Sequence, residues 1–150
     1  MTAHPQSAPT AVRSATSADA PSIAALSAQL GYPTRPEDVA RRLAALRGRE
    51  DHAFSVAIQG EIIVGWVHVA VTQFVHADAQ AEVLGLVVDE HYRGIGAGRL
   101  LMKFAEDWAR SKSCAIIRLR SNILRESAHV FYRRLGYEEF KTSKNFRKSL

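Results

Sequence analysis

The chain has 150 residues, of which 47% are hydrophobic and 23% charged, a length and balance typical of one globular domain with its own core. The formal net charge of +5 comes from basic residues spread along the sequence rather than interleaved with aromatic ones, which argues against a nucleic-acid partner. No apolar run has the length of a membrane span, the start of the chain lacks a signal-peptide pattern, and the single cysteine, Cys114, cannot form an internal disulfide. We therefore expect a cytoplasmic protein without a membrane partner.

Hydrophobic periodicity and turn residues predict alternating strands and helices after a polar tail over 1–11, which we expect to be disordered. Residues 12–150 are predicted to form one domain. The predicted strands span 12–16, 52–59, 62–72, 80–89 and 115–121, with a terminal hairpin of 137–140 and 145–148. The predicted helices begin near Asp19, after Thr34, after Gly98 and at Ser127, and end before Gly31, before Gly48, near Lys112 and at Leu135. This order predicts an α+β fold, in which a mixed sheet of six to seven strands carries helices on both faces.

Two local patterns make this prediction more specific. Thr34 and Glu37 have the spacing of a capping box at the start of the second helix. In the strand over 62–72, Trp66 and His68 alternate onto one face, while Ile63 shares the other face with the valines at 67, 69 and 71.

A glycine-rich turn joins the strand over 80–89 to the next helix, with the sequence Arg93-Gly94-Ile95-Gly96-Ala97-Gly98-Arg99. The first turn of a helix presents unpaired backbone N–H groups and partial positive charge, both of which favour a bound phosphate. Glycines permit the close approach and positive φ of such a turn, and the flanking arginines add charge-assisted bonds. The alternative is a tight turn without a ligand. The dinucleotide fingerprint is excluded because Arg99 stands where its third glycine is required.

This turn resembles the Arg/Gln-x-x-Gly-x-Gly/Ala motif of the GNAT superfamily of N-acetyltransferases, in which the loop binds the pyrophosphate of acetyl-coenzyme A (acetyl-CoA). A second GNAT motif ends in Phe-Tyr-x-x-x-Gly-Phe/Tyr, and it is matched position for position by Phe131, Tyr132, Gly136 and Tyr137. The resemblance covers residues 12–150. It implies the GNAT layout, a mostly antiparallel sheet with one splayed strand pair, and acetyl-CoA as co-substrate. Family members are often dimers, which makes a homodimer a further expectation.

The resemblance also implies roles for individual residues. The expected contacts to the pantetheine arm are the backbone of Leu86, Val87 and Val88 and the side chains of Asn122, Ser127 and His129. Tyr132 is expected beside the thioester sulfur, where its phenol would donate a proton to the leaving thiolate. The alternative for Tyr132 is ordinary packing within a helix.

Glu82 is the candidate general base, because its strand is otherwise nearly all apolar. By alternation it shares a side with Leu84, Leu86 and Val88, and that side leads to the cofactor loop. A carboxylate among apolar neighbours tends to have a raised pKa, which suits proton abstraction near neutral pH, directly or through water. Many GNAT enzymes carry a glutamate at this position. The alternative is a strand-edge glutamate that reaches solvent.

The acceptor pocket is predicted on the neighbouring strand. Trp66 and His68 face the same way and are expected to line that pocket together with Tyr32 and Phe74, although simple packing is the alternative for each of them. The six histidines show no metal-ligand spacing, so we expect no metal site.

These features predict an acetyl-CoA-dependent N-acetyltransferase that transfers the acetyl group to a primary amine of a small molecule by direct attack. The C-terminal segment resembles bacterial GNAT proteins of the aminoglycoside-acetyltransferase type, but the acidic residues form no evident cluster for a polycationic acceptor. One alternative is a protein or peptide N-acetyltransferase, which needs an open groove rather than a pocket covered by residues 74–79. The other is a non-catalytic acyl-CoA-binding module, which needs neither Glu82 nor Tyr132.

Overall fold

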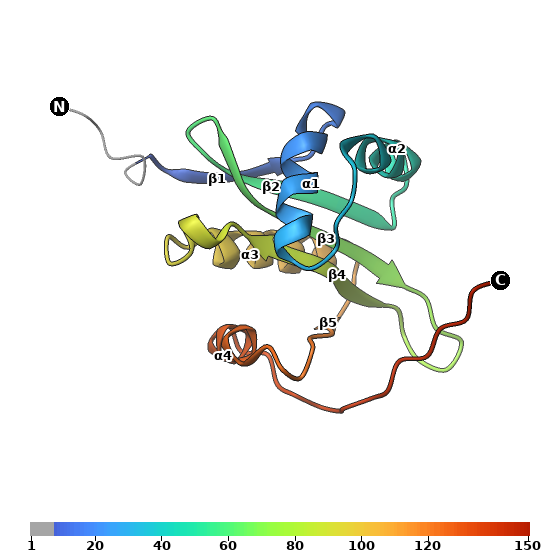
Figure 1. Ribbon diagram of the computed structural model, residues 1–150. Coiled ribbons are helices and arrows are strands. Elements are labelled where there is room, and N and C mark those ends of the chain that lie inside the picture. The colour runs from blue at the N-terminus through green and yellow to red at the C-terminus, as the bar shows by residue number, and fades with distance from the viewer. Residues whose placement is uncertain (1–7) are drawn as a thin grey trace. The chain divides into compact units, whose positions relative to one another are not determined.

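The computed structural model describes residues 8–150, which form two compact units, one ending at Arg120 and the other running from Ser121 to Leu150. In the first unit, five strands form one sheet in the order β1-β2-β3-β4-β5 (Figure 1). The strands are β1 (Thr10–Ser14), β2 (His52–Gln59), β3 (Ile62–Thr72), β4 (Gln80–Val88) and β5 (Ile117–Leu119). The helices of this unit are α1 (Ala20–Gln29), α2 (Pro36–Leu46) and α3 (Ala97–Ser111), and the second unit contains α4 (Glu126–Arg134).

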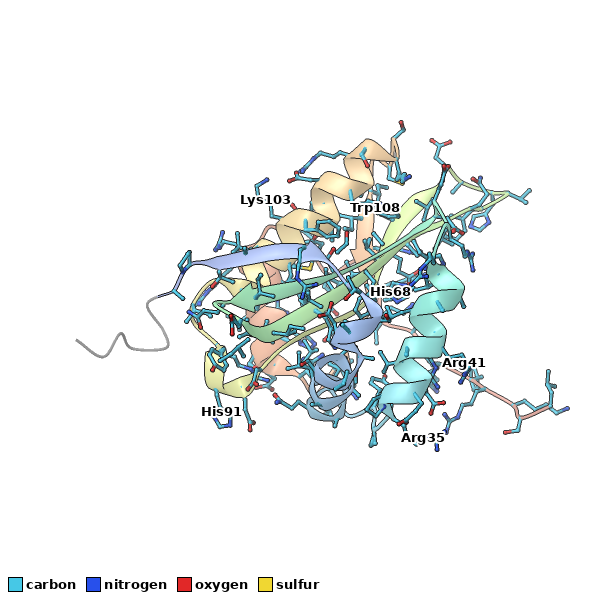
Figure 2. All side chains as sticks on the ribbon, turned by 90° about the horizontal axis from the view of Figure 1, so that it is seen from above. Arg35, Arg41, His68, His91, Lys103 and Trp108 are labelled. Atoms are coloured by element: carbon cyan, nitrogen blue, oxygen red, sulfur yellow. The ribbon has the colours of Figure 1, made fainter. Side chains whose placement is uncertain are left out.

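The sheet has helices on both faces, as predicted. Helix α3 packs on one face, whereas α1 packs on the other with α2 beside it (Figures 1 and 2). Leu101, Met102 and Ala105 of α3 are fully buried on the first side. On the second side Ile23 of α1 and Val39 of α2 join Val56, Trp66 and Val87 of the sheet in one apolar cluster. Within the described residues no helix is long and apolar enough to cross a membrane.

The mostly antiparallel sheet is also confirmed, but its predicted size is wrong. Strands β1 to β4 pair antiparallel, and β5 pairs in parallel with β4 over Ala81–Val83. Strand β5 ends at Leu119, opposite Val83, whereas β4 continues to Val88. The splayed pair therefore stays a prediction. Between residues 8 and 150 the structure has five strands rather than six or seven, because 137–140 and 145–148 form no hairpin. Phe140 and Phe146 are 67% and 91% exposed, and a hairpin without a buried face is not stable alone.

Element ends differ from the prediction by a few residues. Strand β1 begins at Thr10, inside the predicted tail 1–11, of which residues 1–7 lie outside the described range. Helix α4 begins and ends one residue earlier than predicted. The capping box of Thr34 and Glu37 does not form, because Arg35 is the N-cap of α2 and no side chain bonds to that helix end. Pro36 still occupies the first turn, where its missing N–H costs nothing.

Two β-bulges change which side chains share a face. In the pairing of β2 with β3, the partners step from Gly65 to Ile63 and leave Val64 as the extra residue. The face predicted for Ile63 is therefore wrong, and Ile63 packs with the cluster that contains Trp66. In the pairing of β3 with β4, the partners step from Gly85 to Val83 and leave Leu84 unpaired. Each extra residue reverses the alternation for the part of the strand beyond it.

Candidate active site

A cavity of about 780 Å³ lies between α1, α2 and the sheet face that they cover. Phe54, Trp66 and His68 line it from β2 and β3, and Leu84 lines it from the bulge in β4. The chain between the two helices adds Tyr32, and α2 adds polar side chains along one edge. The volume is that of a site for a small molecule. We refer to this cavity as the α2 groove.

Three of the four residues predicted for the acceptor pocket line the α2 groove, namely Tyr32, Trp66 and His68. Phe74 does not. Its ring lies instead under the guanidinium of Arg118, whose central carbon is 4.9 Å from the ring centroid. No residue between 74 and 79 lines the groove, so this loop does not cover it as a lid would.

The groove floor is held by ring contacts. Trp66 stacks on Phe54 with their ring centroids 5.1 Å apart, and its outer ring atoms lie directly over Gly85 of the next strand. A Cβ at Gly85 would be 2.6 Å from Cζ3 of Trp66, so this position has no room for a side chain. The indole is 8% exposed, and its Nε1 has no hydrogen-bond partner among the described residues.

His68 is a neutral group in this floor. Burial and, to a smaller extent, the neighbouring charge of His52 together lower the pKa of His68 to about 4. The two rings share a hydrogen bond, with Nδ1 of His52 2.9 Å from Nε2 of His68. At neutral pH His68 therefore adds a polar surface without a charge. The sequence did not predict that His52 is the hydrogen-bond partner of His68, because this contact depends on the register of β2 against β3.

Glu82 lies on the same sheet face as Trp66 and His68, because it pairs with Ala70 of β3. The prediction that it shares a side with Leu84 is confirmed, because Leu84 lines the α2 groove on this face. The prediction is wrong for Leu86 and Val88, since the bulge at Leu84 reverses the alternation between them and Glu82. That prediction failed although an isolated glycine inside a strand, here Gly85, is a known signal of a bulge.

The surroundings of Glu82 also differ from the apolar ones predicted. Its side chain is 13% exposed and lies between two cations, 3.6 Å from Nη2 of Arg118 and 3.5 Å from Nε of Arg120. Thr72 Oγ1 donates a hydrogen bond to Glu82 at 3.4 Å. Arg118 is the direct partner of Glu82 across the parallel β4–β5 pair. These three partners fix the orientation of the Glu82 carboxylate.

The glycine-rich turn forms the N-terminus of α3. Gly96 is the N-cap with φ 88° and ψ 5°, and Gly94 has φ 82°, so both glycines adopt the left-handed conformation that the motif predicted. No side chain caps the helix, which leaves its first amides available to an anion. The turn is anchored at its start, because the Asp89 amide donates to the Val64 carbonyl at 2.7 Å. Arg93 and Arg99 are both exposed beside it.

In the second unit, the residues of the Phe-Tyr-x-x-x-Gly-Tyr pattern form the C-terminal end of helix α4. The Tyr137 amide donates to the Tyr132 carbonyl and the Gly136 amide to the Arg133 carbonyl, both at 3.0 Å, which is the Schellman arrangement. Gly136 takes φ 93°, and the rings of Tyr132 and Tyr137 meet edge to face with centroids 6.1 Å apart. Burial raises the pKa of Tyr132, so its phenol keeps its proton near neutral pH.

Two of the predicted pantetheine contacts are joined in one turn of this unit. Asn122 Oδ1 accepts from the Leu124 amide at 2.9 Å, and Nε2 of His129 lies 2.9 Å from the Asn122 carbonyl oxygen. Ser127 is exposed in the first turn of α4. Residues 8–150 contain no group of three His, Cys, Asp or Glu side chains placed to hold a metal ion.

Comparison with known proteins gives a family and several related structures. The model of the acetyltransferase (GNAT) family matches residues 20–137. An aminoalkylphosphonate N-acetyltransferase of Salmonella typhimurium is 32% identical over 87 residues, 57% of this chain and 56% of that protein. The chain thus spans about half the length of the curated relatives it matches.

Two solved structures show the same fold at low sequence identity. A transcriptional regulator from Bacillus halodurans superposes with a TM-score of 0.83 at 22% identity, covering 93% of this chain and 100% of that one. The aminoglycoside N-acetyltransferase AAC(6')-Iy, solved in complex with CoA, superposes with a TM-score of 0.84 at 15% identity, covering 99% of this chain and 100% of that one. Because the family model matches most of its length, this chain belongs to the GNAT family of acetyltransferases.

Proposed function

We propose that this protein is an acetyl-CoA-dependent N-acetyltransferase that acts on a primary amine of a small molecule. One observation carries the proposal: β4 holds Glu82 on the same sheet face as the α2 groove, outside the groove lining, and leads from there to the glycine turn that begins α3. A candidate base and a candidate phosphate site therefore lie on one continuous segment. The family and the N-acetyltransferase activity of the Salmonella relative support the reaction class.

The proposed binding of acetyl-CoA uses the backbone. The amides that begin α3, with Gly94, Gly96, Arg93 and Arg99, would hold the pyrophosphate. In the described structure β4 has no partner strand on its β5 side beyond Val83, so the backbone groups of 84–88 on that edge are available to the pantetheine arm. Asn122, Ser127 and His129 remain proposed contacts to the same arm.

In the proposed reaction the amine nitrogen attacks the thioester carbonyl carbon, the C–N bond forms and the C–S bond breaks. Glu82 takes the proton of the amine, directly or through water, and Tyr132 gives its phenolic proton to the leaving thiolate. The raised pKa of Tyr132 supports this role, because a proton donor must be protonated at the working pH. Arg118 and Arg120 would keep the Glu82 carboxylate in place.

Thiol release from acetyl-CoA tests the proposal with a panel of amines. We expect Glu82→Gln and Tyr132→Phe each to lower kcat by about 100-fold, the usual contribution of one acid or base. Tyr132→Phe removes only the hydroxyl. It keeps the ring that contacts Tyr137 and leaves the backbone bonds of the helix ending in place. Unchanged turnover in both variants would refute the assigned roles.

The absence of a lid over the α2 groove bears on the peptide alternative. Because residues 74–79 leave the groove uncovered, the feature expected to exclude a peptide or protein acceptor is not present in the described structure. Lysine peptides therefore belong in the amine panel. A protein that binds acetyl-CoA in calorimetry but releases no thiol with any amine would instead be an acyl-CoA-binding module.

A further inference from the structure

The charged side chains of the α2 groove differ in whether a partner of opposite charge compensates them. Arg35, Asp38 and Arg42 of this region line it. The Asp38 carboxylate is shared by two cations, with Oδ2 3.4 Å from Nε of Arg35 and Oδ1 3.3 Å from Nη2 of Arg41. The one carboxylate in the groove lining is thus already neutralised, and it offers little to an incoming cation.

Arg42 is in the opposite situation. Its Nη1 donates to Thr34 Oγ1 at 3.0 Å, and no carboxylate lies within ion-pair distance of its guanidinium in the described part of the chain. A neutral partner orients the guanidinium but leaves its charge uncompensated. The other N–H groups of its planar fork remain suited to two oxygens of one anion.

The floor of the same groove is uncharged. Nε1 of Trp66 is buried below this floor and has no partner among the described residues, so its N–H is not presented to a ligand in the groove. His68 beside it is neutral and adds no competing charge. Among the described residues, the groove lining therefore offers the uncompensated charge of Arg42 and no free carboxylate.

We propose that the acceptor amine carries an oxyanion group, a carboxylate, phosphate or phosphonate, and that Arg42 binds this group in the α2 groove. The inference rests on the proposed acetyltransferase function and specifies its substrate class. Polycationic acceptors such as aminoglycosides are disfavoured, because they would meet the charge of Arg42 with no free carboxylate in the lining to offset it. Arg42 acts here as a specificity residue that touches the substrate away from the reacting nitrogen.

Matched primary amines test this proposal in the thiol-release assay: 2-aminoethylphosphonate and β-alanine as anions, ethanolamine as the neutral compound and ethylenediamine as the cation. We expect kcat/KM for the anionic amines to exceed that for the other two by about tenfold or more. In Arg42→Gln the ratio of kcat/KM for 2-aminoethylphosphonate to that for ethanolamine should fall about tenfold, mainly through KM. Arg42→Glu should shift the preference toward ethylenediamine.

Arg41→Gln is the matched control, because Arg41 is the next residue of α2, is 70% exposed and does not line the groove (Figure 2). It removes the same charge and leaves Asp38 paired with Arg35, so the ratio should fall far less than in Arg42→Gln. Equal preference for all four amines, or equal ratios in Arg41→Gln and Arg42→Gln, would overturn the proposal.

If no amine releases thiol, the proposed function fails, and calorimetric binding of 2-aminoethylphosphonate still tests the groove. Binding that is weakened in Arg42→Gln but not in Arg41→Gln would support the inference in that case. No binding by the unmodified protein would refute it.

Discussion

Replacing Gly85 with alanine should displace the indole of Trp66 from the sheet. The new Cβ would lie 2.6 Å from Cζ3 and 2.7 Å from Cη2 of that ring, whereas carbon atoms pack best at about 3.5–4.0 Å. The ring would have to move by about 1 Å, against its stacking on Phe54 and its near-complete burial. Overpacking of this kind costs about 2 kcal/mol. Without a clash, the same substitution would stabilise the strand by about 0.5 kcal/mol.

A double-mutant cycle separates the clash from other effects. Trp66→Phe removes the outer ring atoms that lie over Gly85, so in that background Gly85→Ala should cost close to nothing. Urea unfolding followed by far-ultraviolet circular dichroism gives the four free energies of unfolding, and we expect a coupling of about 2 kcal/mol.

Gly65→Ala is the matched control for this cycle. Its Cβ would meet the backbone oxygen of Val87 at 2.7 Å, which Trp66→Phe does not relieve. Its cost should therefore be the same in both backgrounds. If Gly85→Ala also costs the same in both, the contact with Trp66 is not what keeps this position a glycine.

Two further predictions concern titratable groups. Asp19 is buried and accepts two hydrogen bonds from Arg13, at 2.7 and 2.9 Å, and these bonds lower the pKa of Asp19 below its ordinary value. The resulting stability is present above about pH 4 and is lost as the pH falls through the lowered pKa. Asp19→Asn should therefore cost about 2 kcal/mol at pH 7, and the gap to the unmodified protein should close on acidification. A gap that persists in acid would contradict this reasoning. His68 should titrate near pH 4 by NMR of its imidazole carbons, and a value above 6 would show that it is not desolvated.

The sequence was a good guide where one local pattern decides the structure. The alternation of Phe54, Val56 and Ile58 placed β2 correctly, and the glycine turn gave the start of α3 and its positive φ angles. Such features depend on neighbours within a few residues of each other, so their signals survive without knowledge of the fold.

The sequence was a poor guide where a register or a distant partner decides. The bulges at Val64 and Leu84 are properties of paired strands, and each reverses a pattern that looks regular in one strand alone. The cations around Glu82 are Arg118 of β5 and Arg120 just after that strand, and both lie far from Glu82 in the chain. Likewise, no pattern in α2 distinguishes Arg41 from Arg42, because their difference is the presence of a carboxylate partner.

The helix ending of α4 limits what the Phe-Tyr-x-x-x-Gly-Tyr motif says about catalytic activity in a relative. Gly136 is required by a left-handed backbone turn, and Tyr137 is held by its contact with the ring of Tyr132. A descendant that had lost acetyl transfer but kept this helix would be under the same pressure to retain the glycine and both rings. Neither the backbone bonds of the helix ending nor its contact between the two rings uses the phenolic oxygen of Tyr132. Under the proposed acid role of Tyr132, phenylalanine at that position among relatives of this chain would distinguish inactive members from active ones better than loss of the motif as a whole.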